Sequence, residues 1–218
     1  AEGVLSTMTA GTLLVDHTTT SKALAEELHA ACNDLGIAFI DAPVSGGQAG
    51  AENGVLTVMA GGEASAFEVM EPVIAAYAKH TQRMGDVGSG QVTKMVNQLC
   101  IAGILGGLSE AFHFAECAGL DIDEVTRAIQ GGAAQSWQMN NRAETMAQRK
   151  YDFGFAIDWM RKDLGFALDV AQQLGLHLPV ATMVDDHYAN VQRDGGGRWD
   201  TSGLIEQIRM RTEKTQAC

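Results

Sequence analysis

A lysine and an asparagine stand three positions apart in the segment GSGQVTKMVNQ, residues 88–98. On a helix this spacing places Lys94 and Asn97 on the same face. The surrounding positions are apolar almost all round, which predicts a helix buried on most sides: Val92, Met95, Val96, Leu99, Cys100, Ile101, Ile104 and Leu105. A lysine held away from water is costly unless it has a partner, and such a lysine can both donate and accept a proton near neutral pH. The residues alone therefore support a proton-transfer role and a structural role equally.

A second candidate site lies in DAPVSGG, residues 41–47, where Ser45, Gly46 and Gly47 follow an apolar run. Successive backbone N–H groups in such a turn can point at one spot and hold an anion such as a carboxylate. A loop that only needs positive φ angles has the same composition. Both interpretations stay open, and the plain loop is the simpler one.

The glycines of GSGQVTK do not complete a dinucleotide-binding fingerprint. The third glycine of that fingerprint would fall at Thr93, and no strong buried strand leads into the turn. A glycine turn that lets a long helix start close to neighbouring backbone is the better interpretation.

Three other residues could serve a site but have ordinary explanations. Lys162 and Asp163, in KDLG, are typical of the exposed side of an amphipathic helix, and Trp137 could belong to a core or an interface. The six histidines are scattered without metal-ligand spacing, so no role is assigned to them.

Composition and charge exclude several classes of function. A formal net charge of −12, with no run of basic residues, disfavours nucleic acid and anionic membrane surfaces as partners. The four cysteines form no CxxC pair, which argues against a zinc or redox motif and favours a reducing compartment, the cytoplasm. The apolar run of residues 95–114 is interrupted by polar side chains and is a poor bilayer span, and no secretory leader is visible.

The elements that must position these residues change character along the chain. Residues 12–16, 37–44, 55–62 and 81–84 read as strands, residues 21–35 and 63–78 as helices, and residues 45–54 as a glycine-rich loop. From residue 88 onward the pattern is helical only, over 90–118, 121–130, 136–148, 155–174, 179–193 and 202–213. We therefore expect an α/β domain, residues 1–87, and an all-helical domain, residues 88–218, meeting at a cleft.

Together, DAPVSGGQAGAENGVLTVMAGG, GSGQVTKMVNQ and KDLGFALDVAQQLG resemble the β-hydroxyacid dehydrogenase family, which includes 3-hydroxyisobutyrate dehydrogenase. The resemblance spans essentially the whole chain. It implies an incomplete Rossmann-like domain for a nicotinamide cofactor, NAD or NADP, followed by a helical domain built around one long helix. It also implies a small carboxylate substrate and a homodimer or homotetramer.

The resemblance implies a role for each candidate residue. Lys94 would be the catalytic residue, and Asn97 would hydrogen-bond the substrate. Ser45, Gly46 and Gly47 would hold the substrate carboxylate. Thr19 and Lys162 would lie on the cofactor side, while Asp163 would help to close the site and Trp137 would shape the pocket.

The family's diphosphate-binding loop and its NAD-or-NADP selecting residue have no counterpart in residues 1–218 and are expected upstream of residue 1. An imine or aldehyde reductase of the same fold is an alternative, although those relatives tend to replace the lysine found at position 94. A non-catalytic chain that only assembles with sister chains is another.

Overall fold

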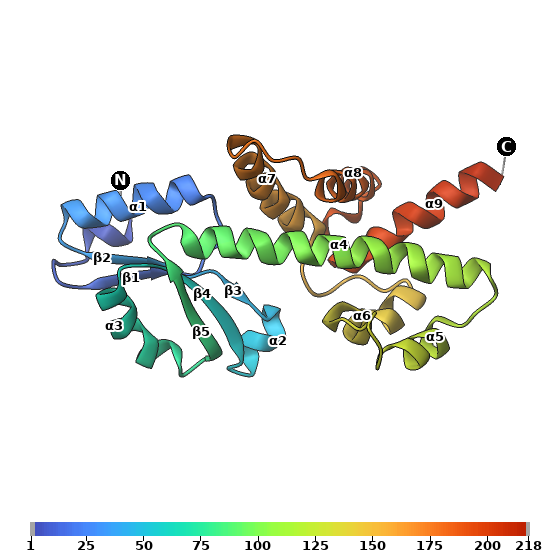
Figure 1. Ribbon diagram of the computed structural model, residues 1–218, viewed down its shortest axis with the longest axis horizontal. Helices are drawn as coiled ribbons and strands as arrows, with labels where there is room; N and C mark the ends of the chain where they lie inside the picture. Colours follow the sequence, from blue (N-terminus) through green and yellow to red (C-terminus); the bar gives the residue numbers. More distant parts are fainter. Residues whose placement is uncertain (1–2, 217–218) are drawn as a thin grey trace. The chain divides into compact units, whose positions relative to one another are not determined.

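The computed structural model describes residues 3–216. The chain divides into two compact units, Ala1–Asn97 and Gln98–Cys218. The division falls inside one continuous helix, α4 (Ser89–Cys117), whose first turns belong to the unit that contains the sheet (Figure 1). We call the two parts the sheet unit and the helical unit.

Among the described residues, five strands form the sheet: β1 (Leu13–Asp16), β2 (Ala38–Asp41), β3 (Val44–Ser45), β4 (Leu56–Gly62) and β5 (Ala78–Gly85). β1 runs parallel to β2 and β4 runs parallel to β5, whereas β4 is antiparallel to β2 and β3. Pro43, which has no N–H to donate, separates β2 from β3, so the predicted strand over residues 37–44 is two short strands. Asp16 and Asp41 are register partners at the carboxyl ends of β1 and β2.

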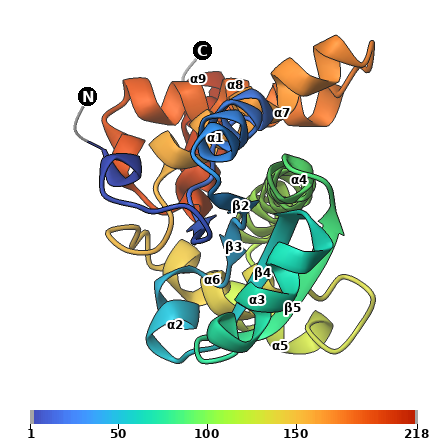
Figure 2. The same cartoon turned by 90° about the vertical axis from the view of Figure 1, so that its left-hand side faces the viewer.

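Helices α1 (Lys22–Asp34) and α3 (Ala64–Ile74) cover opposite faces of the sheet (Figures 1 and 2). Successive residues of a strand point to opposite faces. Phe39 accordingly packs in one apolar cluster with Ala25 of α1, and Ile40 packs in another with Met70 of α3. The sheet unit is therefore a layered α/β structure, as its sequence predicts.

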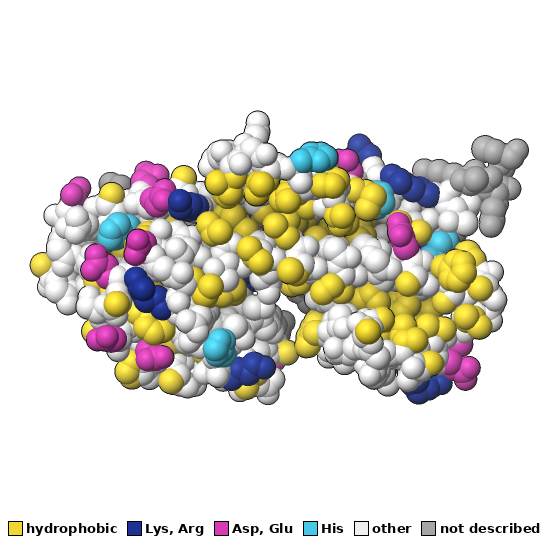
Figure 3. Space-filling view, in the orientation of Figure 1, with side chains coloured by type: hydrophobic (Ala, Val, Ile, Leu, Met, Phe, Trp, Pro, Cys, Tyr) yellow, Lys and Arg dark blue, Asp and Glu magenta, His cyan; other side chains and the backbone are white. Residues whose placement is uncertain are grey.

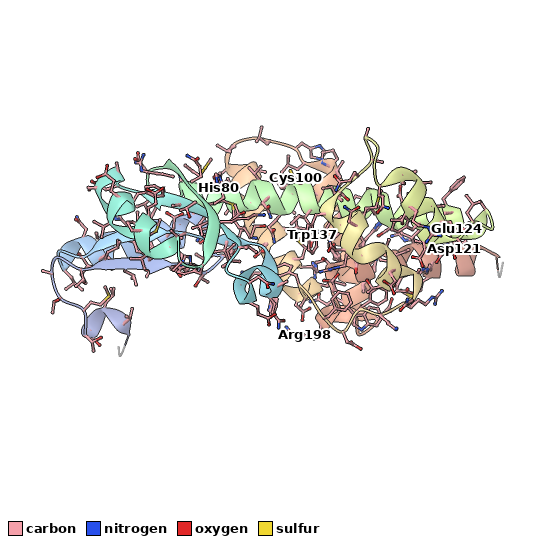
Figure 4. The ribbon with its side chains drawn as sticks, turned by 90° about the horizontal axis from the view of Figure 1, so that it is seen from below. His80, Cys100, Asp121, Glu124, Trp137 and Arg198 are labelled. Carbon is pink, nitrogen blue, oxygen red and sulfur yellow. The ribbon has the colours of Figure 1, made fainter. Side chains whose placement is uncertain are left out.

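The helical unit continues from α4 into α5 (Ile122–Ile129), α6 (Trp137–Ala147), α7 (Ile157–Gln173), α8 (Pro179–Arg193) and α9 (Leu204–Gln216). Asp121 caps α5 by accepting a hydrogen bond from the Glu124 N–H at 2.9 Å; both residues are labelled in Figure 4. Gly119 and Gly175 follow α4 and α7 with φ of 76° and 70°, which confirms the predicted glycine stops.

Two apolar clusters along α4 form the core of the helical unit. In the first, Leu105 packs with Met160 of α7 and Tyr188 of α8. In the second, further along α4, Phe112 packs with Met146 of α6. Length and composition alone would let α4 cross a membrane, but the core helix of a globular fold meets the same test. Here α4 packs against α6, α7 and α8 and is a core helix of the helical unit.

The prediction that α4 is buried on most sides was wrong. Val96, Ile104 and Phe114 are 55%, 38% and 74% exposed. The neighbouring helices cover only part of the α4 circumference, so an all-round apolar helix leaves apolar side chains at the surface. Figure 3 shows such side chains, in yellow, gathered over the helical unit.

The glycine-rich stretch of residues 45–54 also differs from its prediction as a loop, because it contains a short helix, α2 (Gly47–Glu52). The Asn53 side-chain amide donates to the Ala49 carbonyl at 2.7 Å, and the Gln48 side chain donates to Glu52 at 2.7 Å. These local bonds offset part of the low helix propensity of the glycines.

Candidate active site

Lys94 lies in the second turn of α4 and is only 7% exposed. Gln91 and Gln98 are buried as well, at 1% and 2% exposed. At these spacings the three side chains share one face of the helix, and Asn97, which is partly buried, lies beside them. The start of α4 therefore has a buried polar stripe, of which only Lys94 and Asn97 are predicted site residues. Polar residues recurring at intervals of three and four would have revealed the other two.

The loop predicted to hold a carboxylate leads directly into α2. Ser45 ends β3, Gly46 caps α2 with φ of 128°, and Gly47 begins the helix with φ of 59°. A Cβ at Gly46 would lie 3.2 Å from the Leu56 side chain, whereas at Gly47 no heavy atom of the described chain would lie within 4 Å. The first N–H groups of a helix have no acceptor inside the helix. The turn therefore places the first N–H groups of α2 at Gly46 and Gly47, and a side chain at Gly47 would meet no heavy atom of the described chain.

The segment after β1, which contains Thr19, is fixed to the start of α4. The Gln91 side chain accepts a hydrogen bond from the Thr20 N–H at 3.0 Å and donates one to the Thr18 carbonyl at 2.8 Å. Both polar ends of one buried amide are thus used on the two residues that flank Thr19. Gln91 is not among the predicted site residues, because its two partners lie more than seventy positions away in the chain.

His17 anchors the beginning of the same segment. Its Nδ1 lies 2.6 Å from the Ala42 carbonyl oxygen and its Nε2 lies 2.8 Å from the Tyr77 hydroxyl. A neutral ring that carries its proton on Nδ1 satisfies both contacts. His17 received no role from the sequence, because its partners are distant in the chain.

Asp41 is a fully buried carboxylate at the end of β2. It accepts hydrogen bonds from the Gly88 N–H at 2.7 Å and from the Gln91 N–H at 2.9 Å, and so caps α4. Burial raises the pKa of Asp41, and the backbone N–H donors oppose that rise without cancelling it. Because both of its oxygens accept from N–H groups, the geometry suits the ionised form. Asp41 begins the motif DAPVSGG, and nothing in that segment indicates its role.

Lys162 and Asp163 lie on α7. The Asp163 side chain is 2% exposed, and its Oδ2 accepts a hydrogen bond from Gln98 Nε2 at 2.7 Å. Asp163 Oδ1 has no directed hydrogen bond within the described chain, but the Lys162 ammonium lies 3.0 Å away as an ion pair. Asp163 therefore joins α7 to α4 through Gln98, and is not the exposed helix charge that its sequence suggested.

Trp137 begins α6 and is 56% exposed (Figure 4). The Arg142 guanidinium lies 4.9 Å from the centroid of the Trp137 ring and 4.9 Å from that of Phe153. Arg142 is in turn held by the buried Asp200, through a 3.0 Å contact from its Nε. The indole is thus fixed on one side by a stacked cation and remains open on the other.

The predicted site residues are shared between the two units. The sheet unit contains Thr19, Ser45, Gly46, Gly47, Lys94 and Asn97, whereas the helical unit contains Trp137, Lys162 and Asp163. Within the sheet unit, Gln91 joins the backbone on both sides of Thr19 to the helical turn before Lys94.

The sheet unit has features that fit one end of a nicotinamide cofactor. Ligands of open α/β sheets bind outside the carboxyl ends of parallel strands, and the segment with Thr19 leaves β1 at that edge. Its backbone is held in place by Gln91, and threonine hydroxyls are suitable partners for a neutral carboxamide.

Comparison with known proteins agrees with this arrangement. Residues 1–95 match the family described as the NAD binding domain of 6-phosphogluconate dehydrogenase. Residues 88–208 match the family described as NAD-binding of NADP-dependent 3-hydroxyisobutyrate dehydrogenase.

Individual relatives point the same way. An uncharacterised oxidoreductase of Shewanella frigidimarina is 59% identical over 206 residues, covering 94% of this chain and 71% of the relative. The 2-hydroxy-3-oxopropionate reductase of Escherichia coli is 34% identical, covering 92% of this chain and 68% of the relative. The crystal structure of 3-hydroxyisobutyrate dehydrogenase from Salmonella typhimurium superposes with a TM-score of 0.86 at 34% identity, covering 94% of this chain and 72% of that one.

The extent of these matches, together with a buried lysine at the start of a long helix and an α/β unit before it, establishes the relationship. The chain belongs to the 3-hydroxyisobutyrate dehydrogenase-like family of β-hydroxyacid dehydrogenases, NAD(P)-dependent oxidoreductases that act on a CH–OH group.

Proposed function

We propose that this enzyme interconverts a small β-hydroxy acid, such as 3-hydroxyisobutyrate, and its carbonyl form, with Lys94 as the proton donor and acceptor. The observation that carries the proposal is the Lys94 side chain, 7% exposed, within the polar stripe of α4. Relatives named L-threonate dehydrogenase and 2-(hydroxymethyl)glutarate dehydrogenase support a short substrate with a carboxylate and a hydroxyl group.

Each proposed residue has one task in this reaction. A bound nicotinamide cofactor would supply the hydride acceptor, or in the reduction the hydride donor, for the hydroxyl-bearing carbon. In the oxidation, neutral Lys94 removes the hydroxyl proton; in the reduction, its ammonium gives that proton to the carbonyl oxygen. The ammonium also stabilises negative charge that develops on the oxygen. The Asn97 amide directs that oxygen toward Lys94.

The proposed carboxylate site must attract an anion to a chain with a net charge of −12. The Ser45 hydroxyl and the N–H groups at Gly46 and Gly47 would do this without a cationic side chain, because a turn followed by a helix start presents several donors together. On the helical unit we assign Trp137 to the far wall of the substrate pocket, Asp163 to the substrate side and Lys162 to the cofactor side.

The test is an assay of the complete gene product with a panel of 3-hydroxy acids and both cofactors, following reduced nicotinamide. Lys94→Ala should lower kcat/KM by about 10²-fold or more. The control is Lys79→Ala, which removes an exposed lysine from β5 and should leave kcat/KM unchanged. A loss below about tenfold for Lys94→Ala would contradict the assigned role, and turnover of cyclic imines alone would replace the proposal with an imine reductase.

We also propose that the enzyme is a cytoplasmic homodimer or homotetramer. The free cysteines Cys32, Cys100 and Cys117 support a reducing compartment. The exposed apolar side chains of Phe114 and Val180, which are 74% and 56% exposed, support an assembly. Light scattering after size-exclusion chromatography tests the assembly, and a monomer at micromolar concentration would refute it.

A further inference from the structure

Gln91 and Asp41 form a buried connection that the reaction described above does not use. Gln91 is 1% exposed and Asp41 is fully buried. The Asp41 carboxylate accepts from the Gly88 N–H at 2.7 Å and from the Gln91 N–H at 2.9 Å. The Gln91 backbone, at the beginning of α4, is thereby attached to the end of β2.

The Gln91 side chain then extends this connection to a third segment. Its Oε1 accepts from the Thr20 N–H at 3.0 Å and its Nε2 donates to the Thr18 carbonyl at 2.8 Å. Thr18 and Thr20 are the two neighbours of Thr19, so the backbone on both sides of that residue is held by one side chain. A buried amide with both ends bonded is rigid, since moving it would leave N–H or C=O groups unsatisfied.

The spacing along α4 links Gln91 to Lys94. Lys94 follows Gln91 by three residues, which places the two side chains on the same face one turn apart. A displacement of the Gln91 turn would therefore be transmitted through one turn of hydrogen-bonded helix to Lys94. Gln91 is the side chain that links the backbone on both sides of Thr19 directly to the helical turn before Lys94.

We propose that Gln91 is a positioning residue for hydride transfer, which sets the segment around Thr19 relative to Lys94, while Asp41 fixes the helical turn that carries Gln91. The inference rests on the proposed function, in which Thr19 adjoins the nicotinamide and Lys94 adjoins the reacting oxygen. Small errors in the approach of donor and acceptor are costly, because a misplacement of about 1 Å can lower the rate about 10²-fold.

A simple stabilising role for Gln91 makes different kinetic predictions. If Gln91 only stabilises the fold, its loss reduces the fraction of folded enzyme, and every folded molecule reacts normally. KM values and the primary deuterium isotope effect then stay as in the wild type. If Gln91 positions the reacting groups, kcat falls in every molecule, hydride transfer limits the rate more strongly, and the isotope effect on kcat rises.

The variant of choice is Gln91→Met, which keeps the length of the side chain and removes both hydrogen bonds. We expect kcat to fall by about 10²-fold, with an increased isotope effect for substrate deuterated at the hydroxyl-bearing carbon and little change in KM. Thr93→Val is the matched control, because it removes the 2.7 Å hydrogen bond from Thr93 Oγ1 to the Ser89 carbonyl on the same part of α4. That control should leave kcat and the isotope effect unchanged.

A measurement on the cofactor-free protein makes the test independent of activity. Hydrogen exchange followed by mass spectrometry should show faster exchange at the Thr20 amide in Gln91→Met and no such change in Thr93→Val. If Gln91→Met does not fold, Gln91→Glu is the second variant: as a carboxylate it keeps an acceptor for the Thr20 N–H, has no donor for the Thr18 carbonyl and places a charge in the buried segment, so the same kinetic changes are expected.

The two proposals fail in different ways. A wild-type enzyme that turns over no hydroxy acid would end the proposed function, and the exchange measurement would still decide whether Gln91 holds the segment. An active wild type, an inactive Lys94→Ala, and a Gln91→Met enzyme with normal kcat per folded molecule would overturn the positioning role alone. Unchanged exchange at Thr20 would overturn it as well.

Discussion

Replacing Gly90 by alanine is expected to destabilise the sheet unit because α4 starts against the ends of two strands. A Cβ at Gly90 would lie 2.5 Å from the Met59 carbonyl oxygen, 2.6 Å from the Asp41 carbonyl oxygen and 2.8 Å from Asp41 Oδ2. The first two atoms belong to the backbone of paired strands and cannot move without disturbing the sheet.

The size of the effect follows from three contributions. Overpacking costs about 1–3 kcal/mol, and weakening a hydrogen bond to the Asp41 carboxylate costs about 1.5–3 kcal/mol. The better helix propensity of alanine returns about 1 kcal/mol. Together these give a net loss of about 3 kcal/mol in the free energy of unfolding for Gly90→Ala.

Gly107 supplies the matched control on the same helix. Apart from nearby backbone of α4 itself, no heavy atom of the described chain lies within 4 Å of a Cβ built there. Gly107→Ala should therefore raise stability by about 0.5–1 kcal/mol. Urea unfolding followed by circular dichroism gives the overall change, and hydrogen exchange at the Gly88 and Gln91 amides locates it. Equal unfolding midpoints for the two variants would refute the argument.

Two titratable side chains, the partly buried Glu116 and the buried His187, predict the pH dependence of stability in the helical unit. Burial favours a higher pKa for Glu116, but its hydrogen bonds with Arg209 and His113 outweigh this effect and lower the pKa below 4.5. The contribution of Glu116 to the free energy of unfolding is therefore complete above pH 4.5 and is lost as the pH falls through the lowered pKa. Glu116→Gln should reduce the loss of thermal stability in acid, and an unchanged dependence of the melting temperature on pH would contradict this. Burial, followed by the charge of Arg211, lowers the pKa of His187 below 6.5 despite two nearby carboxylates, so the unfolded chain binds the proton first and stability falls as the pH drops below 6.5. His187→Gln should remove that fall, and its persistence in a melting series from pH 7 to pH 5 would show that another group is responsible.

Local signals in the sequence were sufficient for most of the helices. The start of α4 after Gly88 and its end before Gly119 agree with the predicted helix over residues 90–118, because glycine turns and an apolar run are local features. The same applies to β1, a strand that is followed by a hydroxyl cap at Ser21, although its four residues are only partly buried and not fully buried as expected.

The errors arose where neighbours distant in the chain decide the outcome. The strand expected over residues 81–84 is longer as β5, since eight residues, Ala78–Gly85, find a partner in β4. The exposure of Phe114 depends on which sides of α4 the other helices cover, and the sequence of α4 does not indicate which sides those are.

The candidate site shows the same division. Lys94 and Asn97 could be predicted as site residues because their spacing and their apolar neighbours lie within one short segment of the sequence. Asp41 could not, since a carboxylate at the end of a strand gains its role only when the start of α4 arrives beside it. The sequence around Asp163 predicts a surface charge, because Gln98, its partner, is distant in the sequence.

The glycines that surround Asp41 limit how the enzyme can be recombined with its relatives. A Cβ at Gly61 would lie 2.5 Å from Asp41 Oδ1 and 2.7 Å from the Gly90 nitrogen. The residues at 41, 61 and 90 come from three separate segments, yet each leaves no room for a larger side chain at another. In a chimeric protein these segments must therefore be grafted as a group from one parent.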